Sequence, residues 1–331
     1  MNSFGRIFRV HIFGESHGEC VGITIDGCPA GLSIAPEDLL PDLERRKGGT
    51  QKGATPRQEE DYPIFKSGIF NGKTTGFPIT ILFENKNTRS EDYNKQRSIP
   101  RPGHADWVAH QKFGGNEDYR GGGHFSARLT TGIVAAGAIA KKLMPAINFN
   151  AAVTEIAGEN DLEKGLQKGI DAKDSVGGII ECKVNGLPVG LGEPYFDSVE
   201  SVLSHILFAI PAVRGVEFGT GFAAAKMFGS QHNDAIENME GQTRTNHAGG
   251  IVGGISNGNE LIFRLAVKPT SSTPKIQNSL NWDTGTTEDF SIKGRHDLCV
   301  ALRAPVIVEA VTALVIADFM LLSQHIKRVI V

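Results

Sequence analysis

Histidines in glycine-rich loops are the residues of this sequence best suited to proton transfer. His17 lies in GESHG, His104 in RPGHAD and His124 in GGGHFSAR. The imidazole ring changes charge near neutral pH, and a histidine between glycines has little role in packing. One such residue could equally be a solvated or locally hydrogen-bonded loop histidine. Several in the same setting indicate an acid–base site.

Arginines occupy or flank the same loops and indicate an anionic ligand. Guanidinium groups bind phosphate and carboxylate through paired hydrogen bonds, and glycine-rich backbone offers further N–H donors. The segment KPTSS at 268–272 adds an ammonium group and three hydroxyls, although alone it could be a capped turn with a solvated lysine. The arginines concerned are Arg45, Arg46, Arg57, Arg101, Arg120, Arg128, Arg295 and Arg303.

The sequence lacks the motifs of several other kinds of functional site. The sequence has no GxxxxGK[ST] and no good GxGxxG after a strand, so neither a P-loop nor a Rossmann nucleotide site is indicated. A metal-dependent hydrolase, the best enzymatic rival, would need HxxxH or HxH spacing, so we expect no metal centre. RNA binding through the RGGG at 120–123 would need a basic, aromatic surface, whereas the net charge is -3 and 7% of residues are aromatic. The residues alone indicate an enzyme or binder for a small phosphorylated or carboxylated molecule, without a nucleic-acid partner.

Glycine supports the same interpretation. The chain has 40 glycines in 331 residues, above the roughly 7% usual in proteins. They cluster beside charged residues, whereas a flexible linker would spread them evenly. Glycine permits positive φ and close backbone approach, so the clusters predict loops shaped around a ligand, although any single cluster could be an ordinary turn.

The elements that must position these loops are short strands and a few strongly apolar helices. The pattern at 7–12 and 21–25 predicts a hairpin. Many short strands with few helices are typical of an α+β fold with antiparallel sheets, and no linker divides the chain, so we expect one domain over residues 1–331. Further strands are expected at 77–83, 176–184, 213–218 and 261–267, and helices at 36–47, 105–113, 130–143, 197–210 and 305–322.

The long apolar segment at 305–322 is expected to be a buried helix. Glu309 and Asp318 interrupt it, which would be costly in a bilayer, so we expect no membrane partner. Arg6 and Arg9 break the apolar runs near the N-terminus, so export is not expected. Scattered cysteines without a CxxC pair favour reduced thiols and a cytoplasmic protein: Cys20, Cys28, Cys182 and Cys299.

Six segments together resemble the signature blocks of the chorismate synthase family. They occur in the family's order from near the first residue to near the last, and six in order are highly specific. The segments are GESHGECVGITIDGCPAG (14–31), RPGHAD (101–106), DYRGGG followed by SAR (118–128), NHAGGIVGGIS (246–256), KPTSS (268–272) and GRHD followed by RAPVIVEA (294–310).

The resemblance implies a lyase that acts in the shikimate pathway to aromatic amino acids. The substrate, 5-enolpyruvylshikimate 3-phosphate, loses phosphate and a ring proton in a 1,4-elimination that gives chorismate. Reduced FMN is required although nothing is oxidised overall, which fits the lack of a hydride-transfer fingerprint. NADPH is a possible reductant of the flavin. The resemblance also implies helices packed around a sandwich of antiparallel sheets, and a homotetramer.

Individual roles follow from motif position in the resemblance. His17 resembles the histidine at the reduced flavin, His104 the one that protonates the departing phosphate, and Asp297 the carboxylate that assists proton removal near flavin N5. The substrate-binding positions are matched by Arg46, Lys52, Arg101, Ser126, Arg128 and Arg303. The flavin-contacting positions are matched by His124, Phe125, Ser126, Pro211, Ala212, Gly253, Lys268, Pro269, Thr270, Ser271, Ser272 and Arg295.

Two places depart from the family pattern. Many members have Arg-Ser-Ser where this chain has His124, Phe125 and Ser126, so a positive charge there is expected to depend on pH. Lys52 stands where arginine is common, which keeps the charge but loses the two-pronged hydrogen bonding. We expect altered affinity and no loss of a proton donor.

Overall fold

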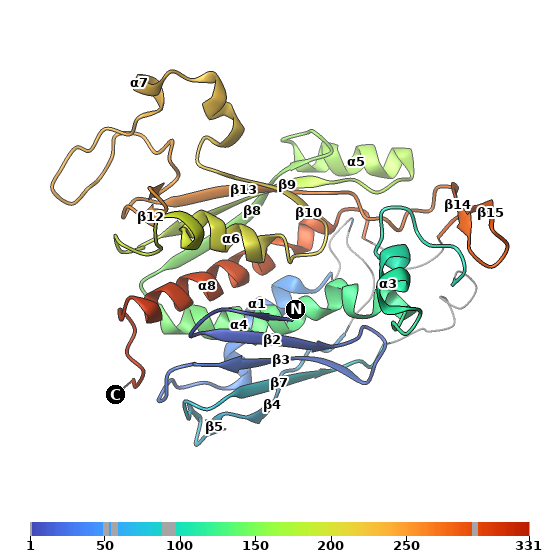
Figure 1. The fold of residues 1–331 in the computed structure, drawn as a ribbon, viewed down its shortest axis with the longest axis horizontal. Helices are drawn as coiled ribbons and strands as arrows, with labels where there is room; N and C mark the ends of the chain where they lie inside the picture. The colour runs from blue at the N-terminus through green and yellow to red at the C-terminus, as the bar shows by residue number, and fades with distance from the viewer. Residues whose placement is uncertain (1, 49–52, 54–58, 88–96, 293–296, 331) are drawn as a thin grey trace.

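Two larger antiparallel sheets enclose a pair of buried helices in the part of the chain that the structure describes (Figure 1). The computed structural model describes residues 2–48, 53, 59–87, 97–292 and 297–330. Helices α4 (Thr130–Leu143) and α8 (Pro305–Leu322) form the middle layer. One sheet has the order β1 (Ser3–Phe4), β2 (Arg9–Gly14), β3 (Cys20–Asp26), β7 (Ile79–Glu84), β4 (Ile64–Ser67), and the other β10 (Val213–Phe218), β13 (Leu261–Val267), β9 (Gly178–Asn185), β8 (Asn148–Ile156).

Each sheet turns one apolar face toward this middle layer. In β13, alternate residues from Leu261 to Val267 are buried, which is the period of a strand with one face in the core. Helix α4 packs on β3 and β7, and α8 packs on β8 and β9. The two helices therefore fill the space between the sheets and join them into one core.

Helices α4 and α8 approach each other closely because small residues lie between them. A Cβ added at Gly137 would lie only 2.3 Å from the Cβ of Ala310. Contacts that close require glycine at one of the two positions. The absence of a side chain at Gly137 therefore sets the spacing of the central layer.

Helix α8 is a core helix, as predicted from its interrupting charges. It is long and apolar enough to cross a membrane, but 83% of it is buried inside the protein. Glu309 accepts hydrogen bonds from Arg45 (2.6 and 2.7 Å) and Lys141 (2.8 Å). Asp318 accepts three from backbone N–H groups of residues 6–8, at 2.7–2.9 Å. Each buried charge is therefore compensated and ties α8 to other elements.

The remaining elements lie outside these layers. Helix α1 packs on α4, α5 on β8, and α6 on α8 and β10. Between β10 and β11, a long excursion carrying α7 projects from the body at the upper left of Figure 1. The bounds are α1 (Leu40–Arg46), α3 (Asp106–Phe113), α5 (Leu162–Ala172), α6 (Val199–Leu207), α7 (Gly229–His232), β5 (Ile69–Phe70), β6 (Lys73–Thr74), β11 (Ile251–Val252), β12 (Ile255–Ser256), β14 (Gln277–Asn281) and β15 (Thr286–Phe290).

The expected α+β class with antiparallel sheets is confirmed, and the structure adds that two of the helices lie between the sheets. The helix expected at 36–47 begins with a 3-10 turn at Pro36–Asp38, and α1 starts only at Leu40. Pro41 falls in the first turn of α1, where its missing N–H is tolerated. The sequence patterns did not indicate β8 or α5. Strand β8 buries only Ala151 and Ile156, although exposed and less exposed residues alternate from Asn148 to Thr154.

Candidate active site

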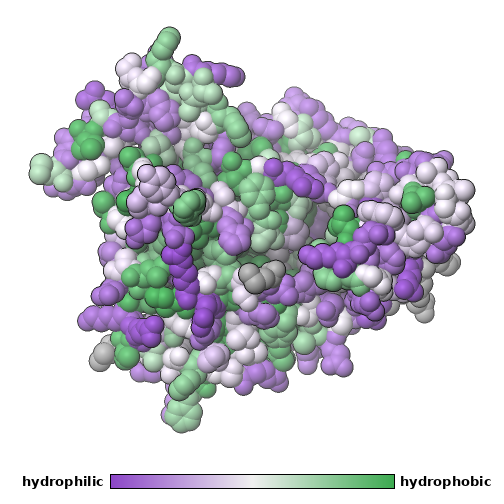
Figure 2. All heavy atoms as spheres, viewed as in Figure 1, coloured by the Kyte–Doolittle hydropathy of each residue, from purple (hydrophilic) through white to green (hydrophobic). Residues whose placement is uncertain are grey.

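A cavity of about 510 Å³ is lined by several loops, among them those before α3 and α4, the connection from α6 to β10 and the loop after β13. This volume is in the range of small-molecule sites. Apolar side chains gather at the centre of the face seen in Figure 2, in the hollow between α6 and α3. The apolar lining residues include Ile12, Leu129, Ile133, Phe208, Ile210, Val213 and Val300.

Most of the predicted flavin-contacting residues line this cavity. They come from the turn before α4, the connection between α6 and β10, and the loop after β13. Two residues predicted to be catalytic, His104 and Asp297, line it too. The predicted flavin contacts in the lining are His124, Phe125, Ser126, Pro211, Ala212, Lys268, Pro269, Thr270 and Ser271.

Three consecutive glycines shape the wall nearest His17. Gly121, Gly122 and Gly123 have φ values of +60°, +81° and +52°, and a Cβ on Gly123 would meet the Asp118 carbonyl oxygen at 1.9 Å. The His17 ring lies directly behind Gly121, where an added Cβ would come within 2.2 Å of it. His17 is buried and does not line the cavity, whereas Gly121, against which its ring lies, does.

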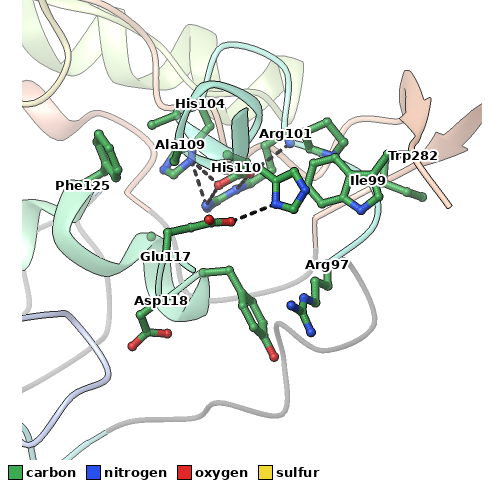
Figure 3. Close-up of a pocket in the computed structure, with 15 residues that line it drawn as sticks. Arg97, Ile99, Arg101, His104, Ala109, His110, Glu117, Asp118, Phe125 and Trp282 are labelled. Atoms are coloured by element: carbon green, nitrogen blue, oxygen red, sulfur yellow. Dashed lines mark hydrogen bonds and ion pairs between the residues drawn. The ribbon is translucent and has the colours of Figure 1, made fainter. Parts of the chain in front are cut away.

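His104 is held by a carboxylate and an arginine from its own loop (Figure 3). Its Nδ1 lies 2.6 Å from Asp106 Oδ1 and 3.0 Å from Arg101 Nη2. Arg101 also donates from Nε and Nη2 to the Asp106 carboxylate, both at 2.7 Å. Burial alone would raise the pKa of Asp106, but the hydrogen bonds from Arg101 and His104 prevail and hold that pKa below its ordinary value.

Positive charge lies next to the loop that carries His104. Lys268 donates to the Gly103 carbonyl oxygen at 2.6 Å and to Ser271 Oγ at 2.9 Å. Burial, together with the charge of Arg214, lowers the pKa of Lys268. Arg214 at the start of β10 lines the cavity as well. Sequence reasoning missed this arginine, although it follows the predicted contacts Pro211 and Ala212 closely.

Ala212 adopts an unusual backbone conformation at the cavity wall. Its φ is +75°, which is rare for a residue other than glycine. Its carbonyl oxygen accepts a hydrogen bond from the Lys268 backbone N–H at 2.9 Å. The conformation costs roughly 1–3 kcal/mol, and that hydrogen bond joins the two loops that carry the flavin-contacting predictions.

Two of the predicted substrate-binding arginines share one buried carboxylate. Arg128 Nη1 donates to Asp61 Oδ1, and Arg46 Nη2 lies 3.4 Å from Asp61 Oδ2. All three are at most 6% exposed. Burial would raise the pKa of Asp61, but the charges of Arg46 and Arg128 outweigh it and hold that pKa below 3.8. Asp61 lies in none of the recognised sequence motifs, so only the fold reveals it.

Asp297 pairs with another predicted substrate-binding arginine. Arg303 donates from Nε to Asp297 Oδ1 at 3.0 Å and from Nη2 to Oδ2 at 2.5 Å. Arg303 and Arg46 line a small pocket that shares Ala127, Thr130 and other residues with the main cavity. The arginine cluster thus lies at one end of the cavity, beside Asp297.

A few predicted residues lie elsewhere. Gly253 is in the turn between β11 and β12, and the structure does not bring it into the lining of the cavity as described. Ser272 is buried and faces Arg101 Nη1 at 3.4 Å. Lys52 and Arg295 are outside the described residues.

Known proteins identify the family. The chorismate synthase family model matches residues 8–321. A protein named chorismate synthase from Chitinophaga pinensis is 66% identical over 330 residues, 99% of each chain. One from Dehalococcoides mccartyi is 44% identical, again over 99% of each chain. A chorismate synthase crystal structure, 24% identical, shares the fold with a TM-score of 0.72 over 97% of this chain and 93% of the other. The sequence and its fold thus lead to one conclusion: this chain belongs to the chorismate synthase family of lyases.

Proposed function

We propose that the cavity at His104 binds 5-enolpyruvylshikimate 3-phosphate beside reduced FMN, and that phosphate and a ring proton are eliminated there to give chorismate. The observation that carries the proposal is the position of His104. It stands on the wall of a cavity that also carries Asp297 and two cations, Lys268 and Arg214. A site for a phosphorylated acid needs this combination of an acid group, a base group and fixed positive charge.

The substrate's negative groups are assigned to the arginine end of the cavity. Arg46 and Arg303 line the small adjoining pocket, and Ser126 lines the main cavity. Arg128 reaches the same region through Asp61. Lys52 is proposed for this group on the resemblance alone.

The cavity suits a flat ring with an anionic tail. Apolar side chains such as Ile133 and Phe208 offer a surface for a ring system, and Lys268 and Arg214 offer charge for a phosphate. When bound, reduced flavin supplies electron density that weakens the bond to the leaving group and is then recovered. His124 faces the same cavity, with its Nδ1 2.9 Å from the Gly14 carbonyl oxygen.

Three residues are assigned to proton handling. His104 delivers a proton to the departing phosphate, since its ring borders the cavity and its Nδ1 is held by Asp106. Asp297, which lines the same cavity, assists removal of the ring proton. His17 acts through the thin glycine wall at Gly121 and favours the anionic form of the flavin.

An anaerobic assay tests the reaction. Dithionite-reduced FMN and 5-enolpyruvylshikimate 3-phosphate are mixed with the protein, and chorismate and phosphate are followed together. The proposal expects equal amounts of both products, and none with oxidised flavin. NADPH in place of dithionite then tells whether the enzyme reduces its own flavin. A folded, flavin-binding protein that forms neither product would refute the proposed reaction.

A homotetramer in the cytoplasm is proposed for the whole enzyme. The excursion around α7 carries exposed apolar side chains, Phe222, Phe228, Ile236 and Met239, of the kind that subunit contacts cover. Cys28 is buried, which raises its thiol pKa to about 12 and fits a reduced, unreactive thiol. Light scattering after size exclusion would give the mass of the particle, and a monomer would refute the tetramer.

A further inference from the structure

We propose that Asp106 is a positioning residue for His104: its carboxylate accepts from Nδ1–H and so turns Nε2–H, the proton donor of the doubly protonated ring, toward the cavity. The inference rests on the proposed function, in which His104 gives a proton to the leaving phosphate. The role of Asp106 goes beyond the three residues assigned to proton transfer. It was not predicted from the sequence, although Asp106 closes the RPGHAD segment.

The geometry around the Asp106 carboxylate leaves His104 one orientation. Oδ1 lies 2.6 Å from His104 Nδ1 and accepts from Arg101 Nη2 at 2.7 Å. Oδ2 accepts from Arg101 Nε at 2.7 Å and from the Arg101 backbone N–H at 3.0 Å. Arg101 Nη2 also lies 3.0 Å from His104 Nδ1. The contact between Nδ1 and Asp106 Oδ1 is the shorter of the two, and a carboxylate held by Arg101 can only accept, so we assign the Nδ1 proton to the bond with Asp106.

The other side of the ring borders the reaction space. His104 is part of the lining of the main cavity, and its ring packs against Gly122, where an added Cβ would lie 3.4 Å from Nε2. His104 lines both the main cavity and a smaller one of about 50 Å³ behind it, between α3 and Trp282 (Figure 3). The ring thus borders both spaces, and its angle decides what Nε2 can reach.

The same contacts change the role expected of Arg101, which was predicted to bind substrate. Three of its N–H groups are engaged by Asp106, and Nη1 lies 3.4 Å from Ser272 Oγ. Arg101 therefore serves Asp106 first, and its direct share in holding substrate is limited to Nη1. The order of support is Arg101 to Asp106 to His104.

Asp106→Asn tests the proposal because an amide cannot replace this carboxylate. Either orientation of the amide puts its NH₂ group against a donor of Arg101, and one of them forces His104 Nδ1 to become an acceptor. We expect kcat to fall about 10- to 100-fold, the range found for carboxylates that orient histidines bound to metals, with flavin affinity changed less than about 2-fold. Asp106→Glu, which keeps the charge, should recover part of the activity.

A double-mutant cycle separates positioning from general damage. If Asp106 acts through His104, the variant carrying both His104→Ala and Asp106→Asn should be no slower than His104→Ala alone. Losses that multiply would overturn the proposal, and so would wild-type turnover in Asp106→Asn. Asp26→Asn, which removes an exposed partner of Arg9, is the matched control and should turn over normally.

Nitrogen NMR of the His104 ring keeps this test independent of the reaction. The wild-type spectrum should show a protonated Nδ1 in the neutral ring, and Asp106→Asn should change the ratio of the two tautomers. An unchanged ratio would overturn the positioning role even if no product forms. An inactive wild type with the expected NMR change would instead refute the proposed function alone.

Discussion

At the scale of single residues, carboxylates organise the charged groups of the site. Arg46 and Arg128 share Asp61. The other two predicted substrate-binding arginines among the described residues are Arg101, which pairs with Asp106, and Arg303, which pairs with Asp297. The motifs predict where cations gather. They do not predict the partners, because Asp61 is 67 residues from Arg128 and meets it only in the fold.

His104→Ala should reduce turnover by roughly 100-fold or more, because general acid catalysis of the phosphate's departure is lost. Flavin binding should be nearly intact. Steady-state rates and flavin titration measure the two effects separately. His325→Ala, at an exposed histidine outside the cavity, is the control and should keep wild-type rates; a His104 variant that did the same would remove His104 from the mechanism.

Asp61→Asn should destabilise the protein by roughly 3–5 kcal/mol, because it leaves two buried arginines without their shared counter-charge. Inorganic phosphate should restore more stability to this variant than to the wild type. Urea unfolding with and without phosphate measures both effects. Equal free energies of unfolding for the variant and the wild type would show that Asp61 is not needed to compensate Arg46 and Arg128.

At the scale of elements, the sequence predicted best those helices and strands whose apolar pattern and end signals both lie within the element. The bounds of α4, α8, β10 and β13 agree with the expected ranges, because their apolar periodicity and end signals lie within the element itself. Strand β8 and the β14–β15 hairpin were missed. Their residues are largely polar or half-exposed, so partners distant in sequence decide their conformation.

Gly137→Ala tests the spacing of α4 and α8. Alanine favours a helix, but here its methyl group would meet Ala310 at 2.3 Å, so we expect a net loss of roughly 1–3 kcal/mol from overpacking. Gly229→Ala is the matched control, because that helical glycine in α7 has no atom within 4 Å of an added Cβ. Thermal unfolding of both variants decides the matter: if Gly137→Ala is as stable as Gly229→Ala, the helices can move apart freely.

At the scale of the whole molecule, buried carboxylates with lowered pKa values link the layers. Glu309 joins α8 to Arg45 of α1, Lys141 of α4 and the Ala151 backbone of β8. Burial would raise its pKa, but the hydrogen bond from Arg45 and the charge of Lys141 hold that pKa below 4.5. The site and the core therefore depend on the same kind of buried, ionised group.

Stability should fall steeply on acidification. The pKa values of Asp61, Asp106 and Glu309 are lowered in the folded protein, so the unfolded chain binds more protons. Their stabilisation is complete above the ordinary pKa values of 3.8 and 4.5 and is lost as the pH falls through these toward the folded values. Urea unfolding between about pH 6 and pH 3 measures the slope. A flat profile would contradict this account.

The position of α8 in the chain has a consequence for synthesis on the ribosome. Both sheets rest on the layer to which α8 belongs, yet α8 spans Pro305–Leu322 and follows every strand of those sheets in the sequence. During translation β8 and β9 emerge before α8, the helix that packs on them, so their inner face stays uncovered until then. The core can be completed only after α8 has followed the last strand, and until then chaperones have an apolar surface to protect.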